Sequence, residues 1–236
     1  MPINLSNNIV VQSGFTNNGD YTDRIIRDDL KIYLDAANPN SWTGSGNWLD
    51  LSGYGNDCVW GTAPSFVDQY FNFTGTQAGT ITANSSLDGS KNQTVMMVLM
   101  KTNSAARRNP WNRAYGGYGT WTDEIAGTTN YYFGDAGDST DPYVSSATSA
   151  VSLNTWKILT ASRNLEKQLT YKNGIQESEV TNPYGQLTTD NNNITIGNGY
   201  AGPWIGRIAL VLMYTRALHP YEVAVNFQAI RGRFGL

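Results

Sequence analysis

The chain has 236 residues, of which 40% are hydrophobic and only 15% are charged, and its formal net charge at pH 7 is -3. This length and apolar content are sufficient to bury a core, and all-β sandwiches of this size are commonly single domains. The negative charge argues against a nucleic-acid-binding surface, which needs a concentrated positive field. The single cysteine excludes an internal disulfide, and no segment approaches the length of a membrane-spanning helix.

Residues 1–24 predict an N-terminal arm. They carry one short apolar run, at residues 9–11, among Asn and Ser. This run either adds an edge strand to the chain's own sandwich or reaches a neighbouring subunit, and we favour the neighbour because exposed arms often bridge subunits in assemblies. The N-terminus lacks the basic start and continuous apolar stretch of a secretory signal. We therefore expect synthesis in a cytoplasm without export by the usual route.

Residues 29–35 predict the first strand, in which Leu30, Ile32 and Leu34 share one face. A loop rich in Asn, Pro and Gly follows, with many turn signals.

Residues 66–73 and 79–82 predict the next two strands. Before them, Trp42 and Trp48 flank the loop and are interpreted as buried supports for it. Cys58 is interpreted as a small apolar residue buried in a strand.

Residues 93–101 predict a strand that is apolar on both faces. Its two alternating sets of side chains are Val95, Met97 and Leu99, and Met96, Val98 and Met100. One face suits the core. The other needs a cover, which the closing helix, a long loop or another subunit could supply.

Residues 102–149 depart from a regular alternation of strands and turns. Aromatic side chains are crowded there among Gly, Asn and Asp, the mixture expected of a surface that stacks on and hydrogen-bonds flat polar ligands. The candidate ligand-binding residues, for a glycan, are Trp111, Tyr115, Tyr118, Trp121 and Tyr143. The alternative is that several of these rings fill the sandwich, above all Tyr131 and Phe133, which share one face of a strand.

Arg107, Arg108 and Arg113 form a basic cluster beside Trp111. We interpret this cluster as a solvated or partner-facing patch and not as a nucleic-acid site.

Residues 155–163 and 168–172 predict neighbouring strands. Asn173-Gly174 follows them, and Asn-Gly is the strongest short signal for a hairpin turn. The strands on either side of this turn are therefore expected to be antiparallel and adjacent.

Residues 193–236 predict the closing elements, namely a short strand at 193–196, a Gly-rich turn, a strand at 205–214 and a terminal helix. The long strand is apolar on both faces, with period-two alternation. Its expected faces are Ile208, Leu210, Leu212 and Tyr214 on one side, and Ala209, Val211 and Met213 on the other.

The terminal helix is expected to fold back over the outside of this strand. Pro220 suits its first position, with His219 as a possible cap and Glu222 in the first turn. Gly232 is expected to end the helix. The apolar stripe consists of Val223, Phe227 and Ile230.

Five runs of sequence resemble the concanavalin A-like jelly rolls of laminin G type, namely YTRALHPYEVAVNFQAIRGRFG, KIYLDAANPNSW, WLDLSGYGND, WKILTASR and LTYKNGIQ. They look most like the variety found as modules in bacteriophage virion proteins, and the RGRFG run is the most specific part. The resemblance covers nearly everything after residue 29. It implies that Asp35, Asp50 and Asp57 mainly organise loops by accepting backbone hydrogen bonds, with a metal role as the alternative.

The predicted fold is therefore all-β. Residues 25–236 are expected to form one two-sheet antiparallel jelly-roll sandwich of concanavalin A-like type with a short C-terminal helix, preceded by the arm or edge strand of residues 1–24.

The acidic residues do not match a glycanase, which places them at alternating positions of one strand. Asp123 and Glu124 are consecutive. Glu177 and Glu179 share a face but lie just past a hairpin turn, where a solvated edge is expected. We therefore predict no catalytic residues and no enzyme activity, with a glycoside hydrolase as the least favoured function.

We also predict no cofactor. The sole histidine, His219, cannot form a catalytic triad or a metal cluster by itself. Asp135, Asp138 and Asp141 are spaced unlike a helix-loop-helix calcium loop, so a bound calcium ion is only an alternative to a solvated acidic loop.

The expected function is that of a non-enzymatic bacteriophage virion protein, in a capsid decoration or tail-associated position. It would dock on other virion proteins, self-associate as a homo-oligomer, and bind neither nucleic acid nor membrane. The alternative is a carbohydrate-binding adhesin that recognises host surface glycans through the loops at residues 107–143. The two hypotheses are compatible, and sequence does not choose between head and tail.

Overall fold

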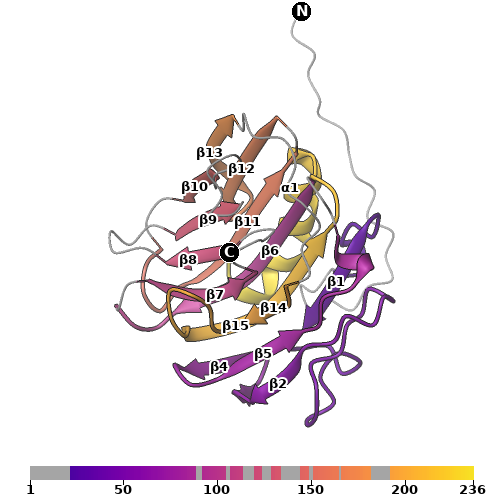
Figure 1. Ribbon diagram of the computed structural model, residues 1–236, viewed down its shortest axis with the longest axis vertical. Coiled ribbons are helices and arrows are strands. Elements are labelled where there is room, and N and C mark those ends of the chain that lie inside the picture. The colour runs from indigo at the N-terminus through magenta and orange to yellow at the C-terminus, as the bar shows by residue number, and fades with distance from the viewer. Residues whose placement is uncertain are drawn as a thin grey trace, which may run out of the picture.

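The computed structural model describes residues 22–88, 92–104, 107–113, 120–123, 129–133, 144–148, 151–164, 166–181 and 192–236, with the backbone alone described for 120–123, 129–133 and 144–148. Within these residues the strands form two facing antiparallel sheets (Figure 1). The predicted two-sheet jelly-roll sandwich with a short C-terminal helix is confirmed.

The eight-stranded sheet has the order β13 (Ile175–Thr181), β12 (Lys167–Lys172), β11 (Trp156–Arg163), β6 (Gln93–Lys101), β15 (Ile205–Tyr214), β4 (Tyr70–Thr74) and β3 (Ser65–Val67), and β1 (Leu30–Asp35) also pairs with β15. The seven-stranded sheet has the order β10 (Val144–Thr148), β9 (Thr129–Phe133), β8 (Thr120–Asp123), β7 (Arg108–Asn112), β14 (Ile194–Ile196), β5 (Ala78–Ile81) and β2 (Val59–Thr62). The helices are η1 (Thr22–Arg24), η2 (Ser85–Leu87), α1 (Pro220–Ile230) and η3 (Arg231–Phe234).

The main core lies between the two sheets. Phe71, Met97 and Val211 of the eight-stranded sheet pack there in one cluster with Ile81 and Ile196 of the seven-stranded sheet. Burying each such side chain contributes about 1.5–3 kcal/mol relative to exposing it, so this layer holds the sandwich together.

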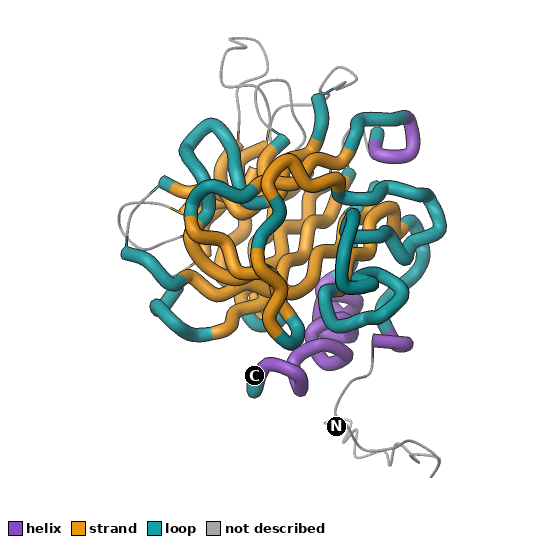
Figure 2. Tube along the Cα trace, turned by 90° about the horizontal axis from the view of Figure 1, so that it is seen from below, coloured by secondary structure: helices purple, strands orange, loops and turns teal. Residues whose placement is uncertain are grey.

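A second core lies between the eight-stranded sheet and α1, which crosses the outer face of that sheet (Figure 2). Met96 and Val98 of β6 face the helix, whereas Val95, Met97 and Leu99 face the other sheet. The predicted alternation of β6 is thus confirmed. The chain's own helix supplies the cover that another subunit could have supplied.

The predicted alternation of β15 fails at Ala209, which forms a β-bulge. Ile208 pairs with Leu99 but Leu210 pairs with Val98, so one extra residue interrupts the register and reverses the faces. Ile208 therefore lies between the sheets while Leu210 faces the helix, and the prediction that they share a face is wrong. The carbonyl of Ala209 accepts a hydrogen bond from the N–H of Ala36 at 2.9 Å.

A similar irregularity lies in β1, between Leu30 and Ile32. Leu30 faces the helix with Tyr33, whereas Ile32 and Leu34 face the inter-sheet core. The predicted common face is therefore wrong for Leu30.

The start of α1 is as predicted. His219 is the N-cap, and its backbone N–H donates to the Glu222 carboxylate at 2.8 Å, which completes a capping box beside Pro220. Arg216 donates two hydrogen bonds to the same carboxylate, at 2.8 and 2.6 Å. These contacts fix the angle at which the chain leaves β15.

Gly232 does not end the helix, so that prediction is wrong. The chain continues from α1 into the 3-10 turn η3, and the left-handed residue that terminates it is Gly235, with φ 66°.

The RGRFG run, at residues 231–235, is held against β1 by an ion pair. Arg233 forms a two-pronged ion pair with Asp35, at 2.8 and 2.9 Å, and both side chains are almost fully buried. The Phe234 ring lies 4.9 Å from the ring of Trp156, and Arg231 donates to the Leu236 carbonyl at 2.8 Å. The final residues are thus held at the helix end of the sandwich.

The loop after β1 is organised by carboxylates. Asp50 accepts hydrogen bonds from the backbone N–H groups of Tyr33, Ser52 and Asn56, at 2.8, 3.0 and 3.0 Å. Asp57 accepts one from the N–H of Asp50 at 2.8 Å. The loop-organising role predicted for these residues is confirmed.

Of the two residues predicted to support this loop, Trp48 is fully buried and Trp42 is partly buried. Trp48 and Cys58 are fully buried and bridged by backbone hydrogen bonds, and Trp42 packs on the same core. Burial also raises the pKa of the Cys58 thiol.

The single strand predicted at 66–73 is two strands, β3 and β4, because Asp68 adopts a left-handed conformation with φ 52° and turns the chain. The other predicted hairpin is confirmed. Asn173 and Gly174 have φ 52° and 74°, and β12 and β13 pair on either side of them. A Cβ on Gly174 would lie 2.8 Å from the Phe227 ring, so this turn packs tightly against α1.

Residues 22–26 pack against α1. Ile25 is buried in the second core, and the N–H of Ile26 donates to Asn226 at 2.9 Å. Residues 1–21 lie outside the described residues, so the arm and its partner stay predictions. None of the described helices is long and apolar enough to cross a membrane.

Candidate functional site

Of the predicted ligand-binding residues, the structure describes the side chain of Trp111 alone. Trp121 lies in β8, of which only the backbone is described, and Tyr115, Tyr118 and Tyr143 lie outside the described residues. Trp111 is fully buried between the sheets. Its indole is therefore part of the core and is not offered to a ligand.

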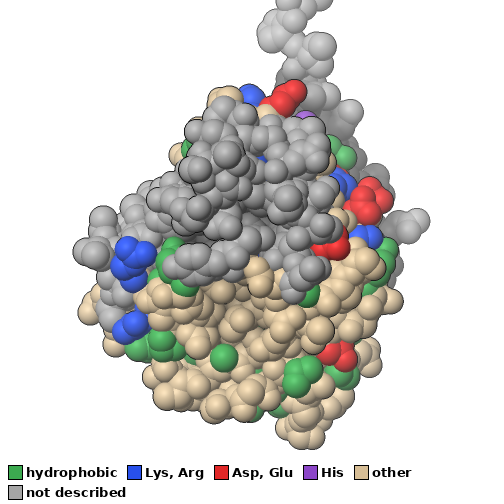
Figure 3. All heavy atoms as spheres, viewed as in Figure 1, with side chains coloured by type: hydrophobic (Ala, Val, Ile, Leu, Met, Phe, Trp, Pro, Cys, Tyr) green, Lys and Arg blue, Asp and Glu red, His purple; other side chains and the backbone are tan. Residues whose placement is uncertain are grey.

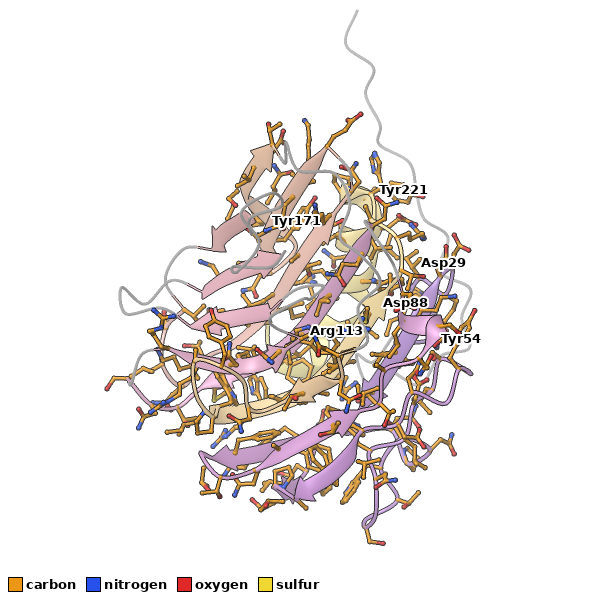
Figure 4. All side chains as sticks on the ribbon, viewed as in Figure 1. Asp29, Tyr54, Asp88, Arg113, Tyr171 and Tyr221 are labelled. Atoms are coloured by element: carbon orange, nitrogen blue, oxygen red, sulfur yellow. The ribbon has the colours of Figure 1, made fainter. Side chains whose placement is uncertain are left out.

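Arg113 was expected in a solvated patch, and that expectation is wrong. Its side chain is fully buried and donates to the carbonyls of Asn192 and Leu87, both at 3.0 Å. Its second terminal nitrogen lies 3.8 Å from a carboxylate oxygen of Asp88 (Figure 4). Arg113 thus ties the end of β7 to two loops, whereas Arg107 is exposed as expected.

The outer face of the seven-stranded sheet carries uncharged polar side chains at its centre. Thr80, Thr195 and Asn112 are cross-strand neighbours on β5, β14 and β7, and all three are partly exposed. Figure 3 shows this side of the molecule, on which the lower centre is mostly tan and the blue side chains lie toward the edges. The Gly-rich turn after β14 packs so closely that a Cβ on Gly199 would lie 2.6 Å from Asn112.

The outer face of the eight-stranded sheet carries a different row of side chains, at the end that α1 leaves uncovered. Strand pairing aligns its members, which we name the Arg207 row: Ser65, Asn72, Arg207, Met100 and Trp156. Sequence reasoning missed this row because its members come from five strands and no local run joins them.

Aromatic rings lie beside the Arg207 row, on the side toward η3. The rings of Tyr70 and Trp156 are 5.4 Å apart, and Trp156 also contacts Phe234. The guanidinium carbon of Arg207 lies 4.7 Å from the centre of the Tyr70 ring, a cation–π distance. The row therefore combines a flat apolar surface with a positive charge.

The carboxylates considered for catalysis have structural partners where they are described. Glu177 and Glu179 lie on the edge strand β13 and form ion pairs with Lys172 and Lys167. No group of three or more His, Cys, Asp or Glu side chains in the described part of the chain could hold a metal ion. The calcium alternative, at residues 135–141, lies outside that part.

A protein-family profile described as the concanavalin A-like lectin/glucanases superfamily matches residues 73–224, well over half of the chain. No curated protein sequence matches the chain.

Several solved structures share the fold at low sequence identity. The binding domain of Paraclostridial Mosquitocidal Protein 1 has a TM-score of 0.68 and 18% identity, over 85% of this chain and 52% of that one. The botulinum neurotoxin serotype D ligand-binding domain in complex with N-acetylneuraminic acid has a TM-score of 0.70 and 14% identity, over 87% and 52%. The botulinum neurotoxin DC binding domain in complex with SialylT has a TM-score of 0.68 and 10% identity, over 86% and 52%. The chain thus spans about half the length of the domains it resembles.

Proposed function

The chain belongs to the concanavalin A-like lectin/glucanases superfamily, and we propose that it is a non-catalytic module that binds carbohydrate. The observation that carries this proposal is the shared sandwich, which covers most of the chain and recurs in toxin binding domains, one of which is solved with N-acetylneuraminic acid. The ion-paired positions of Glu177 and Glu179 on an edge strand support binding without bond cleavage.

The test is a glycan array probed with the purified chain, followed by titration calorimetry on the bound glycans. We expect saturable binding and no release of reducing ends after prolonged incubation. Absence of binding to every glycan class would contradict the proposal, and hydrolysis of a bound glycan would replace it with a glycoside hydrolase.

We further propose that the module is carried on a bacteriophage particle and docks there on other virion proteins. The resemblance of the RGRFG run to virion modules supports this setting. The apolar outer faces of β6 and β15 do not support it, because α1 covers them. Mass spectrometry of cross-linked purified particles should detect the chain linked to head or tail subunits, and its absence from washed particles would refute the setting.

Self-association belongs to the same proposal. Light scattering of the purified chain should give a mass that is a multiple of 25.9 kDa. A monomer at all concentrations would refute it.

A further inference from the structure

We propose that the Arg207 row is the carbohydrate-binding surface of this chain and that its ligand is a glycan containing a carboxylated sugar. This inference rests on the proposed function and adds to it a location and a ligand class.

The first argument is accessibility. Helix α1 and η3 cover the outer face of the eight-stranded sheet only as far as the rings of Tyr70, Trp156 and Phe234. Beyond those rings, Asn72 and Arg207 are partly exposed. Met100, between Arg207 and Trp156, is buried, so the accessible part of the row consists of Ser65, Asn72 and Arg207 beside these aromatic side chains.

The second argument is the state of Arg207. Two other arginines near the helix are neutralised, Arg216 by Glu222 and Arg233 by Asp35. Among the described residues Arg207 has no ion-pair partner, and its Nε is buried without a hydrogen-bond partner. The buried Nε is closed to a ligand, but the side chain is partly exposed, so a ligand anion that reaches the guanidinium would balance its unpaired charge.

The third argument is preorganisation. The guanidinium carbon of Arg207 lies over the Tyr70 ring, 4.7 Å from its centre, a contact that limits the freedom of the side chain before any ligand arrives. A planar guanidinium held in this way loses less entropy on binding a carboxylate through two parallel hydrogen bonds. One arginine balances one negative charge, which suits a sugar carboxylate.

The neighbouring side chains suit the rest of a sugar ring. Trp156 supplies an apolar surface with little flexibility, on which the carbon face of a sugar can lie. The Asn72 amide, next to Arg207 in the row, can both donate and accept hydrogen bonds with sugar hydroxyls.

The experiment measures the affinity of the full chain for polygalacturonate and for polysialic acid, each beside a carboxyl-reduced neutral form, with dextran sulfate and poly-glutamate as two other polyanions. The variants are Arg207→Gln and Asn72→Ala, with Arg231→Gln as the matched control. Arg231 also lies near an aromatic ring, 5.8 Å from the centre of Phe227, but it is outside the row. Melting curves establish that each variant is folded.

We expect at least one acidic glycan to bind, with a loss of about 10-fold or more in Arg207→Gln. A similar loss is expected on carboxyl reduction, with a smaller loss in Asn72→Ala and less than a twofold change in Arg231→Gln. Glycan binding that Arg207→Gln leaves intact would overturn the location but not the proposed function. Equal binding of the reduced glycan or of dextran sulfate would overturn the carboxylate, and equal binding of poly-glutamate would overturn the sugar. No binding to any glycan would overturn the proposed function itself.

Discussion

Replacing Arg233 by alanine is expected to destabilise the whole sandwich, although this residue lies three positions from the end of the chain. Its side chain and that of Asp35 are 4% and 2% exposed, and their two hydrogen bonds are 2.8 and 2.9 Å long. Removing one member of a buried ion pair costs about 3–5 kcal/mol, because the other charge is left without compensation. For a chain of this size each kcal/mol lowers the melting temperature by about 2–4 °C. The expected fall is therefore about 6–20 °C.

Urea unfolding followed by tryptophan fluorescence gives the free energy of unfolding directly. Arg231→Ala is the matched control, because this exposed arginine lies in the same run and is expected to cost less than about 1 kcal/mol. In a chain that already carries Asp35→Ala, the Arg233→Ala substitution should lower the free energy of unfolding much less than it does in the unaltered chain, since the ion pair is already broken. Equal stability of the Arg233→Ala and Arg231→Ala variants would show that the Arg233–Asp35 ion pair does not stabilise the fold.

Three further predictions concern single side chains. Hydrogen bonds from an arginine hold the pKa of Glu222 below its usual range, so its contribution is complete above about pH 4.3 and is lost as the pH falls through the lowered pKa. Glu222→Gln should remove that acid-induced loss from a plot of stability against pH, and an unchanged plot would contradict the ion pair. Gly174→Ala should cost about 1–3 kcal/mol more than Gly55→Ala in urea unfolding, because the two have φ 74° and 72° but only the first Cβ meets a ring; equal costs would exclude the contact. Cys58 should not react with a thiol reagent at pH 8 until the chain unfolds, because it is buried with a raised pKa, and prompt labelling of the folded chain would refute its burial.

The elements with strong local signals could be predicted from the sequence. The bounds of β6 and β15 follow from long apolar runs, and the β12–β13 turn follows from Asn173-Gly174. The start of α1 follows from His219 and Pro220. In each case the residues that decide the structure are adjacent in the chain, so a short window contains the information.

Contacts between distant segments could not be predicted in the same way. Arg113 and Trp111 resemble exposed binding residues in a loop rich in Gly and Asn, yet both are fully buried. What decides their burial is pairing of β7 with β14, more than 80 positions away, since Ile196 pairs with Trp111. A pattern typical of a ligand-binding surface is therefore also compatible with a core.

The β-bulge at Ala209 was also not predicted from the sequence, and it determines which face of the sheet carries Arg207. Strict alternation backwards from Tyr214 and Leu210 would put Arg207 on the inner face, a place where its charge would have to be buried between the sheets. The extra residue reverses the phase, so that Ile208 enters the core and Arg207 reaches the outer face beside Tyr70. The same bulge lets β15 pair with β4 before it and with β1 after it along one edge. The outward position of Arg207 thus depends on this bulge, and a variant that restored regular pairing at Ala209 should lose it.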